Sequence, residues 1–127
     1  MPIKLKNMNE IKPTVSFEDF SKLDIRVGTI VVCEPVDGSE KLYRLEVDFG
    51  QSSNEAGTGK KQILAGIKKF YSIEQLLGRQ AIFVLNLAPR DIMGLTSNGM
   101  LIVAHGEERS AVLYILDQKV ENGSTVS

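Results

Sequence analysis

The 127-residue sequence predicts a single all-β domain, and three observations support this fold class. Beyond residue 23, short runs rich in Val, Ile and aromatic residues alternate with turns that contain Gly, Pro, Asp or Asn. One run, residues 43–49, alternates strictly between apolar and polar side chains. Helical patterns are confined to two short segments. The apolar fraction of 43% and the charged fraction of 24% are typical of globular proteins, so wholesale disorder is not expected.

The first residues are expected to form an arm outside the domain. Residues 1–13 mix Lys and Asn with single apolar residues, and we expect them to be a loose N-terminal arm preceding a domain over 14–127. A short helix should follow, because Ser16 can cap it, with Asp19 three residues later. Phe17, Phe20 and Leu23 recur there at helical spacing.

The rest of the chain is expected to be mainly strands. A second short helix should begin at Ser72, because Ser72 and Gln75 form a capping-box pattern and Gly78 fits the position just past the helix end. A polar, Gly-rich loop is expected over 50–59. The expected strands cover residues 24–34, 43–49, 62–67, 80–86, 100–104 and 111–116.

The order of these elements favours one architecture. Five short strands with a small helix between the third and the fourth are typical of a five-stranded OB-fold barrel, here with N- and C-terminal extensions. Closing such a barrel also removes the exposed edges that short strands would otherwise present. A generic β-sandwich is the alternative, which the strand pattern alone does not exclude.

Charge is unevenly distributed along the chain, although the net charge is only −1. Residues 41–90 hold eight basic and four acidic side chains, whereas both flanking regions are net negative. An anionic partner would therefore bind the middle of the chain. The alternative is an ordinary solvated surface.

Catalytic and metal-binding motifs are not found in the sequence. His105 is the only histidine and Cys33 the only cysteine, which excludes an internal disulfide, a cysteine-based zinc cluster and a histidine pair. Cys33 lies in an apolar strand with no adjacent base, so we expect a buried, inert thiol. We therefore expect no enzyme activity, no catalytic residues, no metal and no cofactor. With no apolar run near the ~20 residues of a membrane helix, we expect a cytoplasmic protein.

Three segments together carry a family resemblance. They are residues 20–28 (FSKLDIRVG), residues 40–50 (EKLYRLEVDFG), and residues 86–90 (NLAPR) followed by Gly94 and residues 97–100 (SNGM). From about residue 15 onward the chain resembles the tRNA-binding domain at the C-terminus of many methionyl-tRNA synthetases. Similar domains occur in free-standing tRNA-binding proteins and in the endothelial monocyte-activating polypeptide.

The resemblance implies an OB barrel that binds tRNA by its structure, largely independently of sequence, without catalysis. Its partners would be tRNA, a second copy of the chain in a homodimer and, in some members, methionyl-tRNA synthetase. The family positions that line the RNA-binding face correspond here to Asn86, Pro89, Arg90, Ser97, Gly99 and Met100. Lys41, in the Lys-Leu-Tyr segment, matches a basic position of the family.

The residue types at these positions suit RNA. Arg90 can form a forked contact with a phosphate, while Asn86 and Ser97 offer hydrogen bonds to base edges or to the ribose hydroxyl. Met100 could contact an unstacked base or simply fill the core. Lys68, Lys69 and Arg79 would add backbone charge, or serve only solubility.

Two departures from the family pattern keep another function open. Residues 36–40 (VDGSE) stand where the family often has His-Pro-x-Ala-Asp, and Asp91 follows Arg90 where a second basic residue is common. On a loop, which we expect here, the Asp91 carboxylate would partly cancel the field of Arg90. The alternative is a CsaA-like homodimeric chaperone that binds unfolded or secretory polypeptides, and a third possibility is a dimerisation module. In either dimer, segments 17–23 and 111–120 would carry the apolar contacts.

Overall fold

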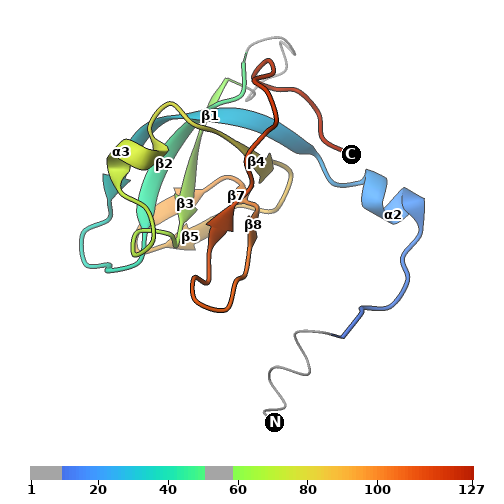
Figure 1. The fold of residues 1–127 in the computed structure, drawn as a ribbon, viewed down its shortest axis with the longest axis horizontal. Helices are drawn as coiled ribbons and strands as arrows, with labels where there is room; N and C mark the ends of the chain where they lie inside the picture. The colour runs from blue at the N-terminus through green and yellow to red at the C-terminus, as the bar shows by residue number, and fades with distance from the viewer. Residues whose placement is uncertain (1–9, 51–58) are drawn as a thin grey trace.

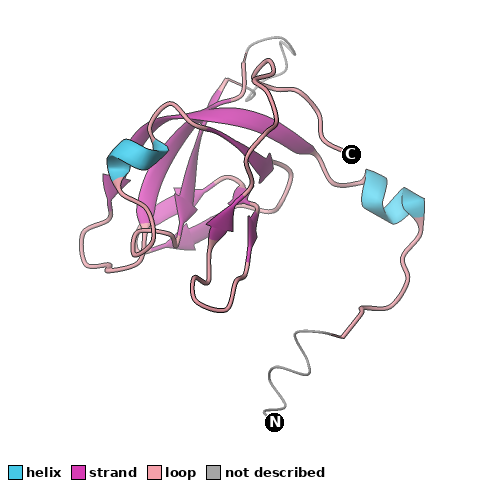
Figure 2. Ribbon diagram, in the orientation of Figure 1, coloured by secondary structure: helices cyan, strands magenta, loops and turns pink. Residues whose placement is uncertain are grey.

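A five-stranded antiparallel sheet, curled into a nearly closed barrel, forms the centre of the computed structural model, which describes residues 10–50 and 59–127 (Figures 1 and 2). The strands follow the order β3-β2-β1-β4-β7. Helix α3 lies between β3 and β4, which confirms the all-β, OB-like fold class. Most of the expected arm (residues 1–9) and of the expected loop (residues 51–58) lies outside the described residues. The strand bounds are β1 Ile25–Pro35, β2 Tyr43–Asp48, β3 Lys60–Ala65, β4 Gln80–Val84 and β7 Met100–Leu101.

Strand β1 is shared between two neighbours. Its first half pairs with β4 and its second half with β2, with a bulge between Ile30 and Val32. The core packs directly against the β1 backbone at Gly28, where a Cβ atom would lie 2.5 Å from Val47 Cγ1 and 2.7 Å from Phe49 Cε1. Only glycine allows this approach. Phe49 then meets Phe83 edge-to-face, with ring centroids 5.4 Å apart.

The alternation predicted for residues 43–49 is present. Tyr43, Leu45 and Val47 are buried on the inner face of β2, and the intervening side chains are half-buried on the outer face. Tyr43 also donates a hydrogen bond from its hydroxyl to the carbonyl oxygen of Tyr71 (2.8 Å), which fastens the segment after β3 to the barrel.

Both predicted helices form with the predicted caps. Helix α3 (Ile73–Leu76) begins with a complete capping box between Ser72 and Gln75, and Gly78 follows it with φ +82°. Helix α2 (Phe17–Ser21) is capped by the Ser16 hydroxyl, which accepts from the Asp19 amide at 3.0 Å. No residue of α2 is buried, and the helix projects away from the barrel in Figure 1.

The region after β4 differs from the prediction. A hairpin of β5 (Arg90–Ile92) and β6 (Leu95–Ser97) occupies what the sequence suggested was a loop. Its turn uses positive φ values at Met93 and Gly94, and strands of three residues are too short to show an alternating pattern. The strand expected over 100–104 divides into β7 and β8 (Val103–Ala104), and β8 pairs with β9 (Val112–Leu113).

The C-terminal segment runs alongside the beginning of β1. The Val27 amide donates to the carbonyl oxygen of Ser124 (2.9 Å), and the Val126 amide donates to that of Ile25 (2.8 Å). The Gln80 side chain donates a hydrogen bond to the carbonyl oxygen of Val120 and accepts one from the Val120 amide. The segment thus belongs to the folded domain. None of the helices in the described ranges has the length and apolarity needed to cross a membrane.

Candidate nucleic-acid interface

Basic side chains from separate parts of the chain meet at the turn between β3 and α3. The Lys68 amide donates to the carbonyl oxygen of Lys41 (3.0 Å), and the Lys68 ammonium lies 3.4 Å from the carbonyl oxygen of Ser39. Lys69 is the next residue and is exposed, as is Lys41. The structure therefore brings together three of the predicted site residues.

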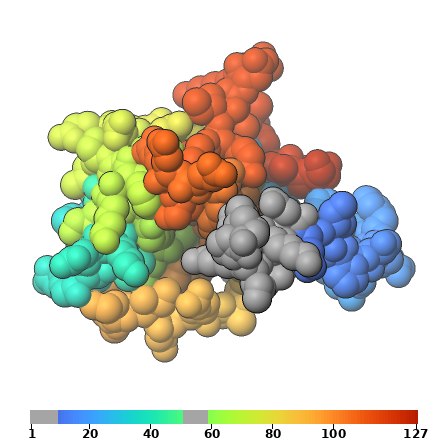
Figure 3. Space-filling view, turned by 60° about the horizontal axis from the view of Figure 1, so that its bottom comes forward, coloured from blue at the N-terminus to red at the C-terminus, as the bar shows by residue number. Residues whose placement is uncertain are grey.

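Two arginines extend this group across Tyr71. The Arg79 guanidinium carbon lies 5.6 Å from the centroid of the Tyr71 ring, and that of Arg109 lies 4.6 Å from the same centroid. Arg109 also stacks on Phe70 (5.9 Å) and donates to the carbonyl oxygen of Phe70. In Figure 3 the red-orange segment that joins β8 to β9 lies against the yellow-green segment around this turn.

These five residues form what we term the turn cluster: Lys41, Lys68, Lys69, Arg79 and Arg109. Among residues 10–50 and 59–127, none of these five residues forms an ion pair within 4.0 Å. Their charges are therefore available to an anionic partner. Sequence reasoning missed Arg109, because it stands in the acidic C-terminal third of the chain and belongs to no motif. In the sequence, the aromatic pair Phe70–Tyr71 directly after Lys68 and Lys69 was the feature that pointed to a place where an arginine could stack.

Three of the residues assigned through the resemblance have structural contacts. The Asn86 side-chain oxygen accepts from the Asp24 amide (2.8 Å), while its amide group donates to the carbonyl oxygen of Lys22 (2.6 Å). Ser97 is buried, and its hydroxyl accepts from the Leu64 amide (3.0 Å) and donates to the carbonyl oxygen of Gly99 (3.1 Å). At Gly99 a Cβ atom would lie 3.0 Å from the carbonyl oxygen of Val84. The Ser97 hydroxyl and Gly99 thus shape the segment that leads to Met100.

The other three assigned residues are accessible. Pro89 and Arg90 are exposed, and Met100 is 47% exposed, so it does not fill the core. Arg90 belongs to β5 and not to a loop, which corrects the sequence-based expectation. Since neighbouring side chains of a strand point to opposite faces, Asp91 is directed away from Arg90. Its carboxylate instead accepts from the Thr96 hydroxyl (2.8 Å).

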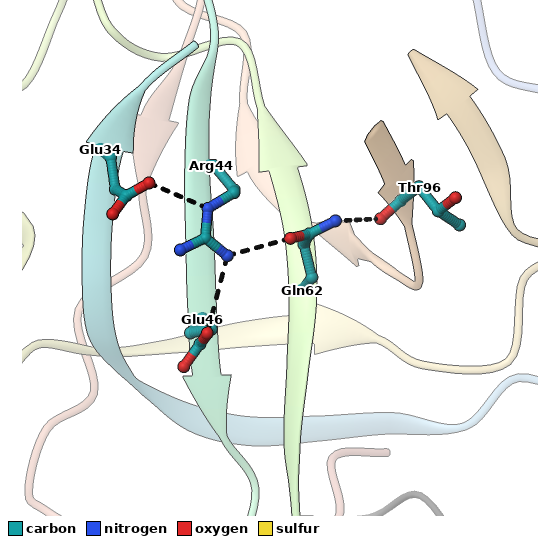
Figure 4. A network of polar contacts seen from close by, with 5 residues as sticks. All are labelled: Glu34, Arg44, Glu46, Gln62 and Thr96. Atoms are coloured by element: carbon teal, nitrogen blue, oxygen red, sulfur yellow. Dashed lines mark hydrogen bonds and ion pairs between the residues drawn. The ribbon is translucent and has the colours of Figure 1, made fainter. Parts of the chain in front are cut away.

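The outer face of β1, β2 and β3 carries a network of one arginine and two carboxylates (Figure 4). The Arg44 guanidinium contacts Glu34 (3.0 Å) and Glu46 (3.6 Å), and donates to the side-chain oxygen of Gln62 (2.9 Å). The hydrogen bond to Glu34 is the largest cause of the raised pKa of Arg44. Gln62 in turn donates to the carbonyl oxygen of Thr96 (2.8 Å), which fastens the β5–β6 hairpin to β3. With two carboxylates around one arginine, this face is less suited to an anion than the turn cluster is.

A pocket lies between the end of β3 and β7, with Met100 among its lining residues. It has a volume of about 290 Å³ and lies where β3 and β7 leave the barrel incompletely closed. One wall is the end of β3 and the residues that follow it, up to Ile67. The opposite wall includes Met100, Leu101 and Val103, and the segment between β8 and β9 contributes His105, Ser110 and Ala111. We term this hollow the seam pocket. Asn86 lies elsewhere, at the junction of α2 and β1.

Other titratable groups suggest no second chemistry. Burial raises the pKa of the Cys33 thiol to about 11, with a smaller contribution from Glu34, so at neutral pH the thiol is protonated and a poor nucleophile. In the described part of the chain, no three His, Cys, Asp or Glu residues lie close enough together to hold a metal ion.

Comparison with known proteins gives consistent relatives. The chain is 44% identical over 117 residues to a methionine–tRNA ligase of Protochlamydia amoebophila, and 41% identical over 113 residues to one of Caldanaerobacter subterraneus. These alignments cover 92% and 89% of the chain, but it spans only 16% of the length of either ligase.

Solved structures include two similar proteins whose whole chains are covered. A MetRS-related protein from Pyrococcus horikoshii aligns over 91% of this chain with a TM-score of 0.80 and 33% identity. The chaperone CsaA from Bacillus anthracis also aligns over 91% of it, with a TM-score of 0.77 and 33% identity.

The family profile described as "Putative tRNA binding domain" matches residues 25–125, which is the whole barrel together with the C-terminal segment that lies along β1. The chain therefore belongs to the tRNA-binding-domain family.

Proposed function

We propose that the chain is a non-catalytic module that binds tRNA through one continuous face. This face comprises the turn cluster, the rim of the seam pocket and the exposed side chains of Pro89, Arg90 and Met100. Contacts would be made mainly with the phosphate backbone, so that binding depends on the shape of the RNA and little on its sequence.

The observation that carries the proposal is that five cations from separate segments gather around the turn between β3 and α3, without an ion-pair partner in the described ranges. Cations already paired with carboxylates would release few counterions when RNA binds, whereas unpaired ones contribute fully. Tyr71, at the centre of the cluster, is only 8% exposed. It therefore supports the arginines and is not itself a platform for stacking several bases.

Each predicted site residue then has one of three roles. Lys41, Lys68, Lys69, Arg79 and Arg90 would contact phosphates. Pro89 and Met100 would contact ribose or base surfaces. Asn86, Ser97 and Gly99 would act as positioning residues, since their polar groups or close contacts are used within the protein.

The relatives suggest the setting. The chain aligns with a stretch that makes up 16% of the length of a methionine–tRNA ligase. We therefore propose that it assists a methionyl-tRNA synthetase in the cytoplasm, either as part of that enzyme or as a separate chain. Its contribution would be to hold tRNA while the synthetase carries out the reaction.

The test is an equilibrium titration of the protein with total tRNA over a series of salt concentrations, with heparin and a reduced, unfolded polypeptide as competitors. We expect tRNA to bind better than heparin, with a log–log salt slope that steepens by about 0.7–0.9 for each phosphate contacted. Binding that is indifferent to salt, or no better for tRNA than for heparin, would contradict the proposal.

A second candidate function is capture of unfolded polypeptides by a homodimer. A specific observation favours it: α2 leaves Phe17 81% exposed, and Ile115 beyond β9 is 80% exposed. Exposed apolar side chains of this size suit a second copy of the chain or a polypeptide segment. Ala111 and Leu113, by contrast, are buried in the chain's own core, so only part of segment 111–120 could take part. In the titration above, this function predicts that the unfolded polypeptide binds and that tRNA does not displace it.

A further inference from the structure

The seam pocket is a hollow lined by β3, β7 and the segment between β8 and β9. Its volume of about 290 Å³ is close to the ~300 Å³ lower bound for small-molecule sites, which is enough for one flat ring system. We propose that the seam pocket receives a single unpaired nucleobase of the bound RNA. This inference rests on the proposed function and adds a defined site for one base, where that function relies mainly on backbone contacts.

The pocket walls offer the surfaces that a base requires. Met100 supplies a polarisable thioether at the rim, and aliphatic side chains of β3 and β7 line the interior. His105 supplies an aromatic ring on which a base can stack. These are contacts to the faces and edges of a ring, and they tolerate more than one base type.

The ring of His105 is held in a defined orientation. Its Nδ1 lies 2.7 Å from the carbonyl oxygen of Ser110, and a carbonyl oxygen can only accept. Nδ1 therefore carries a proton, and in the neutral ring Nε2 is the nitrogen that can accept a hydrogen bond. A base that meets the ring at its edge, as the alternative to stacking on its face, could donate an amino hydrogen to Nε2.

The two lysines that follow the pocket wall suit RNA better than a polypeptide side chain as the occupant, although the segment between β8 and β9 also brings Glu107 and Glu108. Ile67 of the pocket wall is followed directly by Lys68 and Lys69 of the turn cluster, and the Lys68 ammonium lies 3.4 Å from the carbonyl oxygen of Ser39. A phosphate attached to a nucleotide in the pocket would gain from cations at this distance along the chain. An apolar side chain of a polypeptide would fill the same hollow but would gain nothing from the cations.

Gly66 makes the pocket testable without removing a charge. It is exposed in the pocket wall, has φ outside the left-handed range, and no atom of residues 10–50 and 59–127 lies within 4 Å of the position its Cβ would take. Gly66→Val should therefore be accommodated by the fold and add a branched side chain to the pocket wall. Gly59, at the opposite end of β3, likewise has no atom of these residues within 4 Å of its Cβ position and lies outside the pocket, so Gly59→Val is a control.

The experiment compares the wild type, Gly66→Val, Gly59→Val and His105→Ala, after thermal melting has confirmed that each is folded. One probe is total tRNA at several salt concentrations. The other is an RNA hairpin with 2-aminopurine in its loop, whose fluorescence reports stacking of that base. Loss of one stacked base corresponds to about a 5- to 150-fold weaker affinity. We expect this loss for Gly66→Val, a smaller one for His105→Ala and none for Gly59→Val, with the salt slope unchanged because no phosphate contact is removed. The wild type should change the 2-aminopurine signal, and Gly66→Val should not.

Other outcomes would overturn the inference in distinguishable ways. If Gly66→Val and His105→Ala both bind tRNA as Gly59→Val does, with the salt dependence intact, the pocket holds no base but the proposed function stands. If the wild type fails to prefer tRNA over heparin, the proposed function itself fails. If Gly66→Val weakens only the capture of an unfolded polypeptide, the pocket belongs to that ligand.

Discussion

Arg109 shows how the fold prepares one side chain for an anionic partner. Its guanidinium lies over two aromatic rings and donates to the carbonyl oxygen of Phe70, so its position is fixed before any ligand binds. The remaining N–H groups of a five-donor guanidinium are then available to a phosphate. A cation held in place in this way loses less conformational entropy on binding than a mobile surface lysine would.

The first prediction concerns this residue. Arg109→Gln should weaken tRNA binding and lower the log–log salt slope by about 0.7–0.9, because one phosphate contact is lost. Arg109→Lys should retain most of the slope. A purely structural role would lower the melting temperature and leave the slope unchanged, so both are measured. Lys22→Gln is the control, since the Lys22 ammonium pairs with Asp19 on α2 (3.1 Å), outside the turn cluster.

Cys33 gives a prediction about pH. Its pKa of about 11 in the folded protein exceeds the ordinary value of 9.0, so the unfolded chain loses this proton first as pH rises. The associated stability is fully present below pH 9 and decreases as pH approaches 11, by at most about 1.4 kcal/mol per pH unit for one proton. The raised pKa of Tyr43, caused mainly by burial, acts in the same direction.

Urea unfolding at a series of pH values tests this. Between pH 9 and 11 the free energy of unfolding of the wild type should fall more steeply than that of Cys33→Ala. The alanine variant has a smaller core side chain, but that loss does not depend on pH. Parallel curves would show that the thiol keeps an ordinary pKa.

At the scale of elements, Asn86 connects the end of β4 to the junction between α2 and β1. Its two side-chain hydrogen bonds reach the backbone on both sides of Leu23. Sequence reasoning identified Asn86 as a site residue from its motif and its polar type. It could not show that these groups are used within the fold, because the partners lie more than sixty positions away in the chain.

The prediction is that Asn86→Ala loosens this junction. Losing these bonds should cost about 1 kcal/mol of unfolding free energy, and the Asp24 amide should exchange with solvent faster. Hydrogen exchange followed residue by residue would show this, with the amides of β2 as an internal reference. If Asp24 exchange is unchanged while tRNA binding is lost, Asn86 contacts the RNA directly and is not a positioning residue.

Elements with strong local signals were predictable from the sequence, and the others were not. The alternation of β2 and the Ser72 capping box require only neighbouring residues, and both were predicted with the right residues. The β5–β6 hairpin depends on tertiary contacts, such as the bond from Gln62 to the carbonyl oxygen of Thr96, and no periodicity reveals three-residue strands. The same limit applies to the site, because the turn cluster and the seam pocket are assembled from distant segments.

At the scale of the whole molecule, the apolar side chains around α2 are left uncovered by residues 10–50 and 59–127. Helix α2 has no buried residue, and Val15, Phe17, Phe20 and Leu23 are exposed around it. A second copy of the chain could cover these side chains together with Ile115.

We predict a homodimer on this basis. Light scattering at tens of micromolar protein should give twice the chain mass of 14.0 kDa, and Phe17→Ser combined with Ile115→Ser should shift the mass toward that of the monomer. Val112→Ser lies in β9 and is half-buried, so it should lower stability without changing the mass. A monomeric wild type would contradict the prediction and leave the α2 side chains available to another protein.

The distribution of charge over the molecule predicts where RNA should lie. The turn cluster and Arg90 carry cations without carboxylate partners among the described residues, whereas the outer face at Arg44 is balanced by Glu34 and Glu46. The most direct test is to add tRNA to the ¹⁵N-labelled protein and follow each backbone amide by NMR. We predict that the perturbed amides cluster at residues 66–71, 89–91 and 99–105 and around Arg109. Perturbations confined to α2 and residues 114–120, or none at a saturating tRNA concentration, would contradict tRNA binding by this face.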